Sequence, residues 1–130
     1  SKLPPLEGVK LLSDKEVEEQ GIDLFTIKVM DKQYSPKKMK TELKKFIAGS
    51  EKYITPVEYD ANSSYSDVLA YYDMIFVVVD ELRDEYALAS YNTKFDDLLM
   101  DQQNAVRKRY PITIVLKNID ENPDDFGIKR

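Results

Sequence analysis

The strongest constraint on the fold is a row of apolar side chains at helical spacing that follows Ser64. The row consists of Val68, Tyr72, Ile75, Val79, Leu82 and Tyr86. Their steps of four and three residues place them on one face of an α-helix about five turns long. Ser64 and Asp67 have the S-x-x-D pattern of a capping box at its start. We therefore predict a long amphipathic helix that buries this face.

Two further helices are predicted on either side of the long one. Residues Asn92 to Asp97 are a break, and Leu98 to Tyr110 is a helix that Pro111 ends. Earlier in the chain, Ser35 is a helix N-cap and Pro36 takes the first helical position, where its missing N–H costs nothing. We expect that helix to stop at Gly49.

Three strands are predicted from alternating apolar residues. They cover Gly21 to Met30, Tyr53 to Tyr59 and Ile112 to Leu116. Pro56 cannot donate to a ladder, so we expect its strand to lie at an edge of the sheet or to carry a bulge. The order β, α, β, long α, α, β predicts the α+β class, a small sheet with helices packed on one face.

The chain of 130 residues suits one domain. Pro4 and Pro5 indicate an extended segment, and we expect residues 1–20 to be a linker in which Asp14 to Gln20 forms a short helical turn or stays mobile. We place the domain at residues 21–117, followed by a flexible tail at residues 118–130. No run of apolar residues is long enough to span a bilayer.

Charge and residue types exclude several classes of function. The net charge is −5 and the chain has no cysteine and no histidine. Thiol chemistry, zinc sites and Ser-His-Asp triads are thereby excluded, and we expect neither a cofactor nor a metal. The one basic run, Lys37 to Lys45, lies at helical spacing and is explained by a solvated helix face, so we expect no nucleic-acid partner.

Acidic side chains do not make a persuasive site either. The neighbouring carboxylates Asp96 and Asp97 do not face each other on a helix, and we interpret them as surface residues. The segment Asp60 to Ser63 has oxygen-bearing side chains but lacks the spacing of a calcium loop, so a polar loop is the better interpretation. No catalytic residue is predicted.

Part of the chain resembles a known family. The segments that carry the resemblance are Asp60 to Tyr65, the run Asp80-Glu81-Leu82-Arg83-Asp84-Glu85, Tyr91 to Leu98, and Asp101 to Arg107 followed by Tyr110-Pro111. They are similar to the periplasmic domain of ExbD/TolR-type biopolymer transport proteins, in the form common in Bacteroidetes-like bacteria. The similarity covers most of residues 3–111. The chain departs from the family at Thr93, where the family has glycine, and after Pro111.

The resemblance implies a binding module and not an enzyme. In this family a transmembrane helix with a proton-responsive aspartate precedes the domain, which lies at the periplasmic face of the inner membrane. The subunits form a homodimer inside an ExbB-like channel and pass proton-motive work to a TonB-like protein for outer-membrane import. A TolR-type role in envelope maintenance, or a motor for gliding or secretion, would use the same architecture with another partner.

Strand addition is the binding mode that we expect, because an extended partner segment can pair with an exposed sheet edge. The candidate partner-binding residues lie on two predicted edges: Tyr53, Thr55 and Val57 on one, and Ile112, Thr113, Ile114 and Val115 on the other. An unrelated small enzyme is the remaining alternative.

Overall fold

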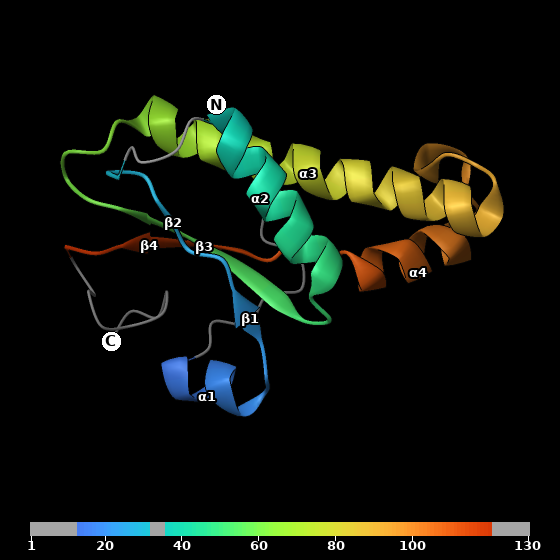
Figure 1. The fold of residues 1–130 in the computed structure, drawn as a ribbon, viewed down its shortest axis with the longest axis horizontal. Coiled ribbons are helices and arrows are strands. Elements are labelled where there is room, and N and C mark those ends of the chain that lie inside the picture. The colour runs from blue at the N-terminus through green and yellow to red at the C-terminus, as the bar shows by residue number, and fades with distance from the viewer. Residues whose placement is uncertain (1–12, 32–35, 121–130) are drawn as a thin grey trace.

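The computed structural model describes residues 13–31 and 36–120 (Figure 1). The elements in chain order are α1 (Asp14–Glu19), β1 (Asp23–Leu24), β2 (Ile27–Lys28), α2 (Pro36–Gly49), β3 (Tyr53–Tyr59), α3 (Tyr65–Tyr91), the 3-10 helix η1 (Phe95–Asp97), α4 (Met100–Arg109) and β4 (Ile114–Asn118).

The strand β3 lies in the centre of the sheet, and every pairing that it makes is parallel. The N–H groups of Phe25 and Val29 donate to the carbonyls of Ile54 and Glu58, so β1 and β2 follow the same side of β3. Thr55 donates instead to Thr113 O, at 2.9 Å, on the side of β4. Because alternate residues point their backbone groups to opposite sides of a strand, the sheet has β1 and β2 on one side of β3 and β4 on the other.

The prediction that Tyr53 to Tyr59 is an edge strand is wrong. Its bounds agree with β3, but β3 pairs on both sides. The structure also explains how a central strand tolerates Pro56. The nitrogen of Pro56 lies on the side of β1 and β2, and the two residues between these strands, Phe25 and Thr26, are opposite Thr55 and Pro56. The missing N–H therefore falls where that ladder is interrupted.

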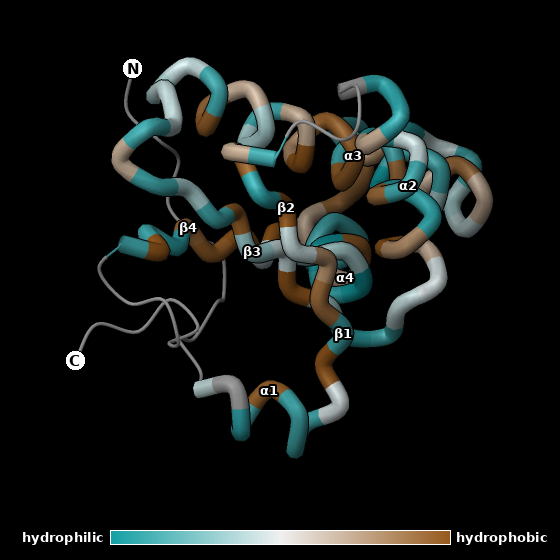
Figure 2. Tube along the Cα trace, turned by 60° about the vertical axis from the view of Figure 1, so that its left-hand side comes forward, coloured by the Kyte–Doolittle hydropathy of each residue, from teal (hydrophilic) through white to brown (hydrophobic). Residues whose placement is uncertain are grey.

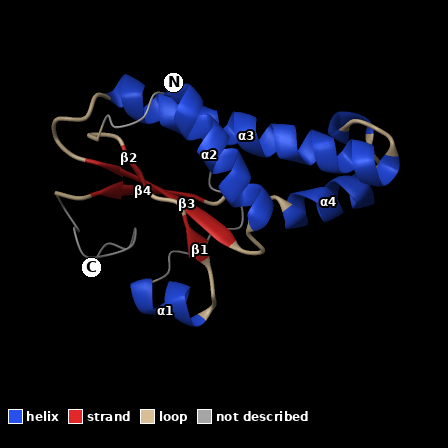
Figure 3. Ribbon diagram, viewed as in Figure 1, coloured by secondary structure: helices blue, strands red, loops and turns tan. Residues whose placement is uncertain are grey.

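Helices α2 and α3 cover one face of the sheet, and α1 lies on the other face (Figure 3). Both connections, β2–α2–β3 and β3–α3–η1–α4–β4, step across the sheet in the same direction. Since such crossovers are right-handed, they bring their helices to the same face. The predicted α+β class, a small sheet with helices packed on it, is confirmed, whereas the parallel strand direction was not predicted.

The main core lies between the sheet and these two helices. The hydropathy colouring shows hydrophobic residues gathered along β3 and α3, whereas α1 is mostly hydrophilic (Figure 2). Five of the six residues in the predicted α3 row are buried, namely Val68, Tyr72, Ile75, Val79 and Leu82. Tyr86 is 37% exposed and meets the ring of Tyr110 edge-on, so the burial of this face ends one turn earlier than predicted.

The predicted helix ends hold at several places. The Ser64 side chain accepts a hydrogen bond from Asp67 N–H and caps α3. At the other end Asn92 adopts a left-handed conformation with φ of 54°, which asparagine tolerates. Pro36 begins α2 and Gly49 ends it, as expected. The predicted cap at Ser35 lies outside the described residues.

The short helix α1 forms within the segment expected to be a linker. Its Val17 is buried and packs with Ile54 and Val115 on the face of the sheet opposite α2 and α3. At the other terminus, Ile119 N–H donates to Tyr59 O, and Asp120 accepts from Ala61 N–H. The expectations for residues 1–12 and 121–130 lie outside the described part of the chain.

Candidate functional site

The residues predicted on β3 are not available to a partner. Tyr53 is 4% exposed, and Thr55 and Val57 are fully buried. The Tyr53 hydroxyl donates to Pro111 O at 2.6 Å, and Thr55 bonds to Thr113 through both its N–H and its hydroxyl. These side chains and their backbone are part of the core, so Tyr53, Thr55 and Val57 are corrected from binding candidates to structural residues.

The second predicted edge does lie at an edge. Within residues 13–31 and 36–120, β4 pairs with β3 alone. The strand begins two residues later than predicted, so Ile112 and Thr113 form its approach, while Ile114 and Val115 lie in it. The structure therefore separates the two sets of predicted residues and leaves one edge, that of β4, as a candidate site.

The outward groups of β4 follow from its hydrogen bonds to β3. Thr113 O accepts from Thr55, and Ile119 N–H donates to Tyr59, so the odd-numbered backbone groups face β3. The N–H and C=O groups of the intervening residues, Ile114, Leu116 and Asn118, consequently face away from the sheet. An unpaired row of this kind is a template for strand addition.

Side chains of β4 are already used for packing. Ile112 and Ile114 are buried against the helical layer, and Val115 is buried on the side of α1. Lys117 is 8% exposed, with its ammonium 4.0 Å from a carboxylate oxygen of Glu58. What β4 can offer a partner is therefore mainly its backbone.

The α3–α4 hairpin extends beyond the sheet (Figure 1), and polar contacts hold its two helices together. Arg83, 5% exposed, donates from Nε to Tyr110 O at 2.9 Å. Asp84 Oδ1 accepts from Phe95 N–H at 3.0 Å, and Gln103 Nε2 donates to Phe95 O at 3.1 Å. These contacts hold η1 and α4 against α3, so Arg83, Asp84 and Gln103 have a structural role.

Cations cover the ring of Phe95 at the same place. The guanidinium carbons of Arg83 and Arg107 lie 5.7 and 5.1 Å from its centroid, within the range of cation–π attraction. A small apolar cluster of Ala87, Leu98 and Val106 packs beneath. At the hairpin end, the polar contacts of Arg83, Arg107 and Phe95 thus cover a small apolar core.

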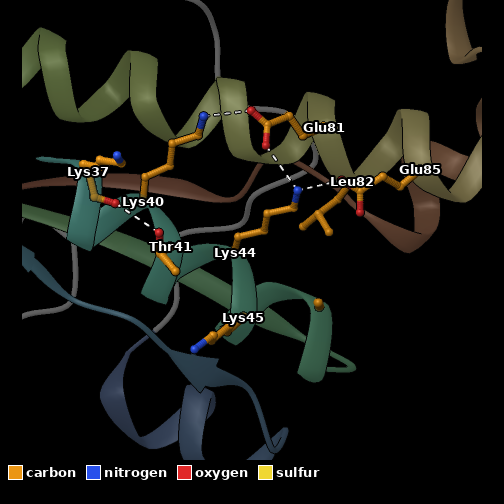
Figure 4. A pocket seen from close by; sticks show the side chains of 9 residues that line it. Lys37, Lys40, Thr41, Lys44, Lys45, Glu81, Leu82 and Glu85 are labelled. Atoms are coloured by element: carbon orange, nitrogen blue, oxygen red, sulfur yellow. Dashed lines mark hydrogen bonds and ion pairs between the residues drawn. The ribbon is translucent and has the colours of Figure 1, made fainter.

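A groove of about 560 Å³ runs between α2 and α3 (Figure 4). Lys40 reaches Glu81 at 2.8 Å, and Lys44 bridges Glu81 at 3.2 Å and Glu85 at 2.6 Å. Two of the lysines that were expected to be simply solvated are therefore ion-paired across the two helices. Lys37 and Lys45 also line the groove, and the structure places neither in an ion pair with any residue it describes.

Pairing shifts the pKa values of two groups in this groove. The hydrogen bond from Lys40 lowers the pKa of the Glu81 carboxyl, with partial burial opposing it and Lys44 adding to it. The hydrogen bond to Glu85 raises the pKa of the Lys44 ammonium, again against partial burial and with help from Glu81. Both groups are therefore held in their charged forms.

Neither a metal site nor a membrane span is found in the described part of the chain. There, no three acidic side chains gather closely enough to hold a metal ion. None of the described helices is long and apolar enough to cross a membrane.

In the residues that the structure describes, the fold is a small mixed helix-and-strand domain with one parallel sheet, and the outer edge of β4 is open. Comparison of the chain with protein-family models, with curated proteins and with solved structures finds no match to any of them.

Sequence reasoning missed the groove because its charges come from two helices far apart in the chain. The only signal was that a basic run on one predicted helix and the acidic cluster Glu81 to Glu85 on another both lie at helical spacing. Which helix packs beside which is set by the strand order, and the strand order was not predicted.

Proposed function

We propose that this chain is the periplasmic domain of an ExbD-type subunit in a proton-driven inner-membrane complex, and that it binds a TonB-like protein by strand addition at β4. The observation that carries the proposal is the outward row of backbone groups at Ile114, Leu116 and Asn118. The similarity of residues Asp80 to Pro111 to the ExbD/TolR family supplies the biological setting.

Backbone pairing suits a partner of this kind. An added strand gains affinity from main-chain hydrogen bonds, and side-chain contacts above and below the sheet set its selectivity. In the proposed complex both proteins are anchored to one membrane. Their effective concentration is then high, so a weak intrinsic affinity is sufficient.

Partly buried apolar side chains of α3 and β4, among them Phe76 and Leu116, pack against the main core. Half-buried Phe76 stacks on Tyr72 at 5.2 Å. It lies seven residues, about two turns, before Arg83 on the same side of α3, and Arg83 binds Tyr110 just ahead of β4.

The proposal includes a homodimer and an ExbB-like channel subunit that contacts a transmembrane helix preceding this domain. It assigns the domain binding and no catalysis. A TolR-type subunit for envelope maintenance, or a gliding or secretion motor, remains the alternative, because it differs in the partner and not in the domain.

The first test is the coding sequence upstream of Ser1. We expect a hydrophobic span of about 20 residues with a single embedded aspartate. A start codon at or just before the codon for Ser1, or a cleavable secretion signal, would remove the link to proton flow.

The second test is photo-crosslinking of the full-length protein in its own cells. A photoreactive residue at Asn118, on the outer edge of β4, should capture the TonB-like protein. The control is the same residue at Ser90, exposed on α3 far from the sheet. Capture of a TolA-like protein at Asn118 would select the envelope-maintenance alternative, and equal capture from both positions would contradict binding at the edge.

A further inference from the structure

We propose that the groove between α2 and α3 is a second binding site, and that it takes an acidic peptide segment of a partner protein. This site is separate from β4 and does not depend on the function proposed above. It is defined by Lys37, Lys40, Lys44 and Lys45 on α2, and by Glu81 and Glu85 on α3.

The charge of the groove is opposite to that of the chain as a whole. The chain carries a net charge of −5, yet four lysines line this groove against two glutamates. A local positive field on an acidic protein selects for anionic groups.

The two glutamates hold the inner lysines in place without using all of their donors. Each ammonium has three N–H donors. Lys40 uses one of its donors on Glu81, and Lys44 uses two, on Glu81 and Glu85. Figure 4 shows both side chains extended from α2 toward α3. Further carboxylates can therefore bind to lysines that are already ordered, which reduces the entropic cost of binding.

The outer lysines are available to an incoming anion. Lys37 and Lys45 are exposed, and among the described residues neither has a carboxylate partner. They lie eight residues apart on α2, about 12 Å along the helix. That separation accommodates a segment with several carboxylates better than a single small anion.

Size and lining also fit a peptide. A volume of about 560 Å³ lies within the range of pockets that bind drug-sized ligands, so it can take one or two side chains of a bound peptide. Leu82 and Ala48 contribute apolar surface between the lysines, and the aliphatic stems of the lysines add to it. An apolar side chain flanked by carboxylates would satisfy both parts of this lining.

The test uses the full 130-residue chain and a short fluorescein-labelled peptide of glutamates around one central leucine. The corresponding glutamine peptide is the ligand control. The variant is Lys37→Glu with Lys45→Glu, which changes charges that the fold does not use. Its matched control is Lys52→Glu with Lys108→Glu, which changes the net charge equally at exposed positions outside the groove.

We expect the glutamate peptide to bind and the glutamine peptide not to bind. Reversal of Lys37 and Lys45 should weaken binding about tenfold or more, since each reversal replaces an attraction by a repulsion. The control pair should change it less than about twofold. In NMR spectra of the unmodified chain, the peptide should shift the amide signals of Thr41, Ala48 and Leu82.

Equal losses in the two double variants would overturn the proposal in favour of non-specific charge attraction, as would shifts confined to other parts of the chain. Full displacement of the peptide by inorganic phosphate at matched ionic strength would assign the groove to small anions instead. Self-association of the unmodified chain that the Lys37 and Lys45 variant abolishes would assign it to a second copy. If the charge-reversed variant does not fold, Lys37→Gln with Lys45→Gln makes the same test with a smaller expected loss.

Discussion

Around Ile75, in the middle of α3, the helix is held by apolar packing on the sheet, whereas two turns later, at Arg83, it is held by polar contacts to its own hairpin. Ile75 is 1% exposed within the main core. Arg83 is almost as buried, but it binds a backbone carbonyl and lies over an aromatic ring. One continuous helix therefore belongs to two differently stabilised regions.

The two regions differ in how strictly they constrain the identities of their residues. A sheet core tolerates many apolar residues of similar volume, so few positions in it require one particular residue. The hairpin end needs particular donors and acceptors, such as Asp84 for Phe95 N–H and Gln103 for Phe95 O. The identities of the residues at the hairpin end are therefore more constrained than those in the sheet core.

The largest effect should follow a cavity in the sheet core. Ile75→Ala removes a fully packed side chain and should lower the free energy of unfolding by about 3 kcal/mol. Val77→Ala, on the same helix but at a 45% exposed position, should cost less than about 0.5 kcal/mol. Urea unfolding of both variants measures the contrast, and similar losses would contradict the burial assigned to α3.

Arg83→Met tests the polar contacts at the hairpin end. It keeps an unbranched apolar stem but removes the donor to Tyr110 O, and it should cost about 2 kcal/mol. The loss should be local at first, with faster amide exchange in α4 than in β3. If amide exchange rose equally in α4 and β3, the hairpin end would not be a separately stabilised region.

Asp84→Ala should have a smaller effect of about 1 kcal/mol, because it removes one exposed acceptor of the Phe95 N–H. The control is Asp73→Ala, at an exposed position on the same helix, for which we expect a change within about 0.5 kcal/mol. Thermal unfolding of the two variants in parallel decides whether the Asp84 contact matters.

The smallest effect should come from the ion pairs of the groove. The folded pKa of Glu81 is lowered, so its stabilising contribution is complete above the unfolded pKa and is lost as the pH falls through the folded value. Since Glu81 is partly exposed, Glu81→Gln should cost only a few tenths of a kcal/mol at pH 7. The difference in unfolding midpoint between Glu81→Gln and the parent chain should therefore be smaller in acid than at pH 7. A difference that grew in acid would contradict the stabilising direction assigned to the Glu81 carboxylate.

Local patterns predicted the helices well and the sheet only in part. The row that starts at Val68, and the cap at Ser64, were sufficient to predict α3, because both signals lie within a few residues of each other. The strand Tyr53 to Tyr59 was also found with its bounds. The central position of this strand in the sheet was not predicted. Whether Pro56 interrupts a ladder depends on which strand its nitrogen faces, and that strand is about 30 residues away in the sequence.

The same limit applies to the surfaces. Ile112 to Val115 were chosen as an edge from position in the chain alone, and β4 does lie at an edge, although shifted by two residues. The pairing of Lys40 and Lys44 with Glu81 and Glu85 needed the packing of α2 on α3, which no local pattern contains. Long-range strand order is therefore the information that would most improve such a prediction.

The central claim, that β4 binds a partner through its outer backbone, is tested most directly by two substitutions at one position. Leu116→Pro removes an outward N–H while the inward bonds of its neighbours remain, and Leu116→Ala removes the side chain but keeps the N–H. Binding is measured to the purified periplasmic segment of the TonB-like protein from the same genome, after thermal unfolding shows that both variants fold. We predict a loss of about tenfold or more for the proline variant, and less than about threefold for the alanine variant. Parental affinity in the proline variant, or equal losses in both, would contradict strand addition at β4.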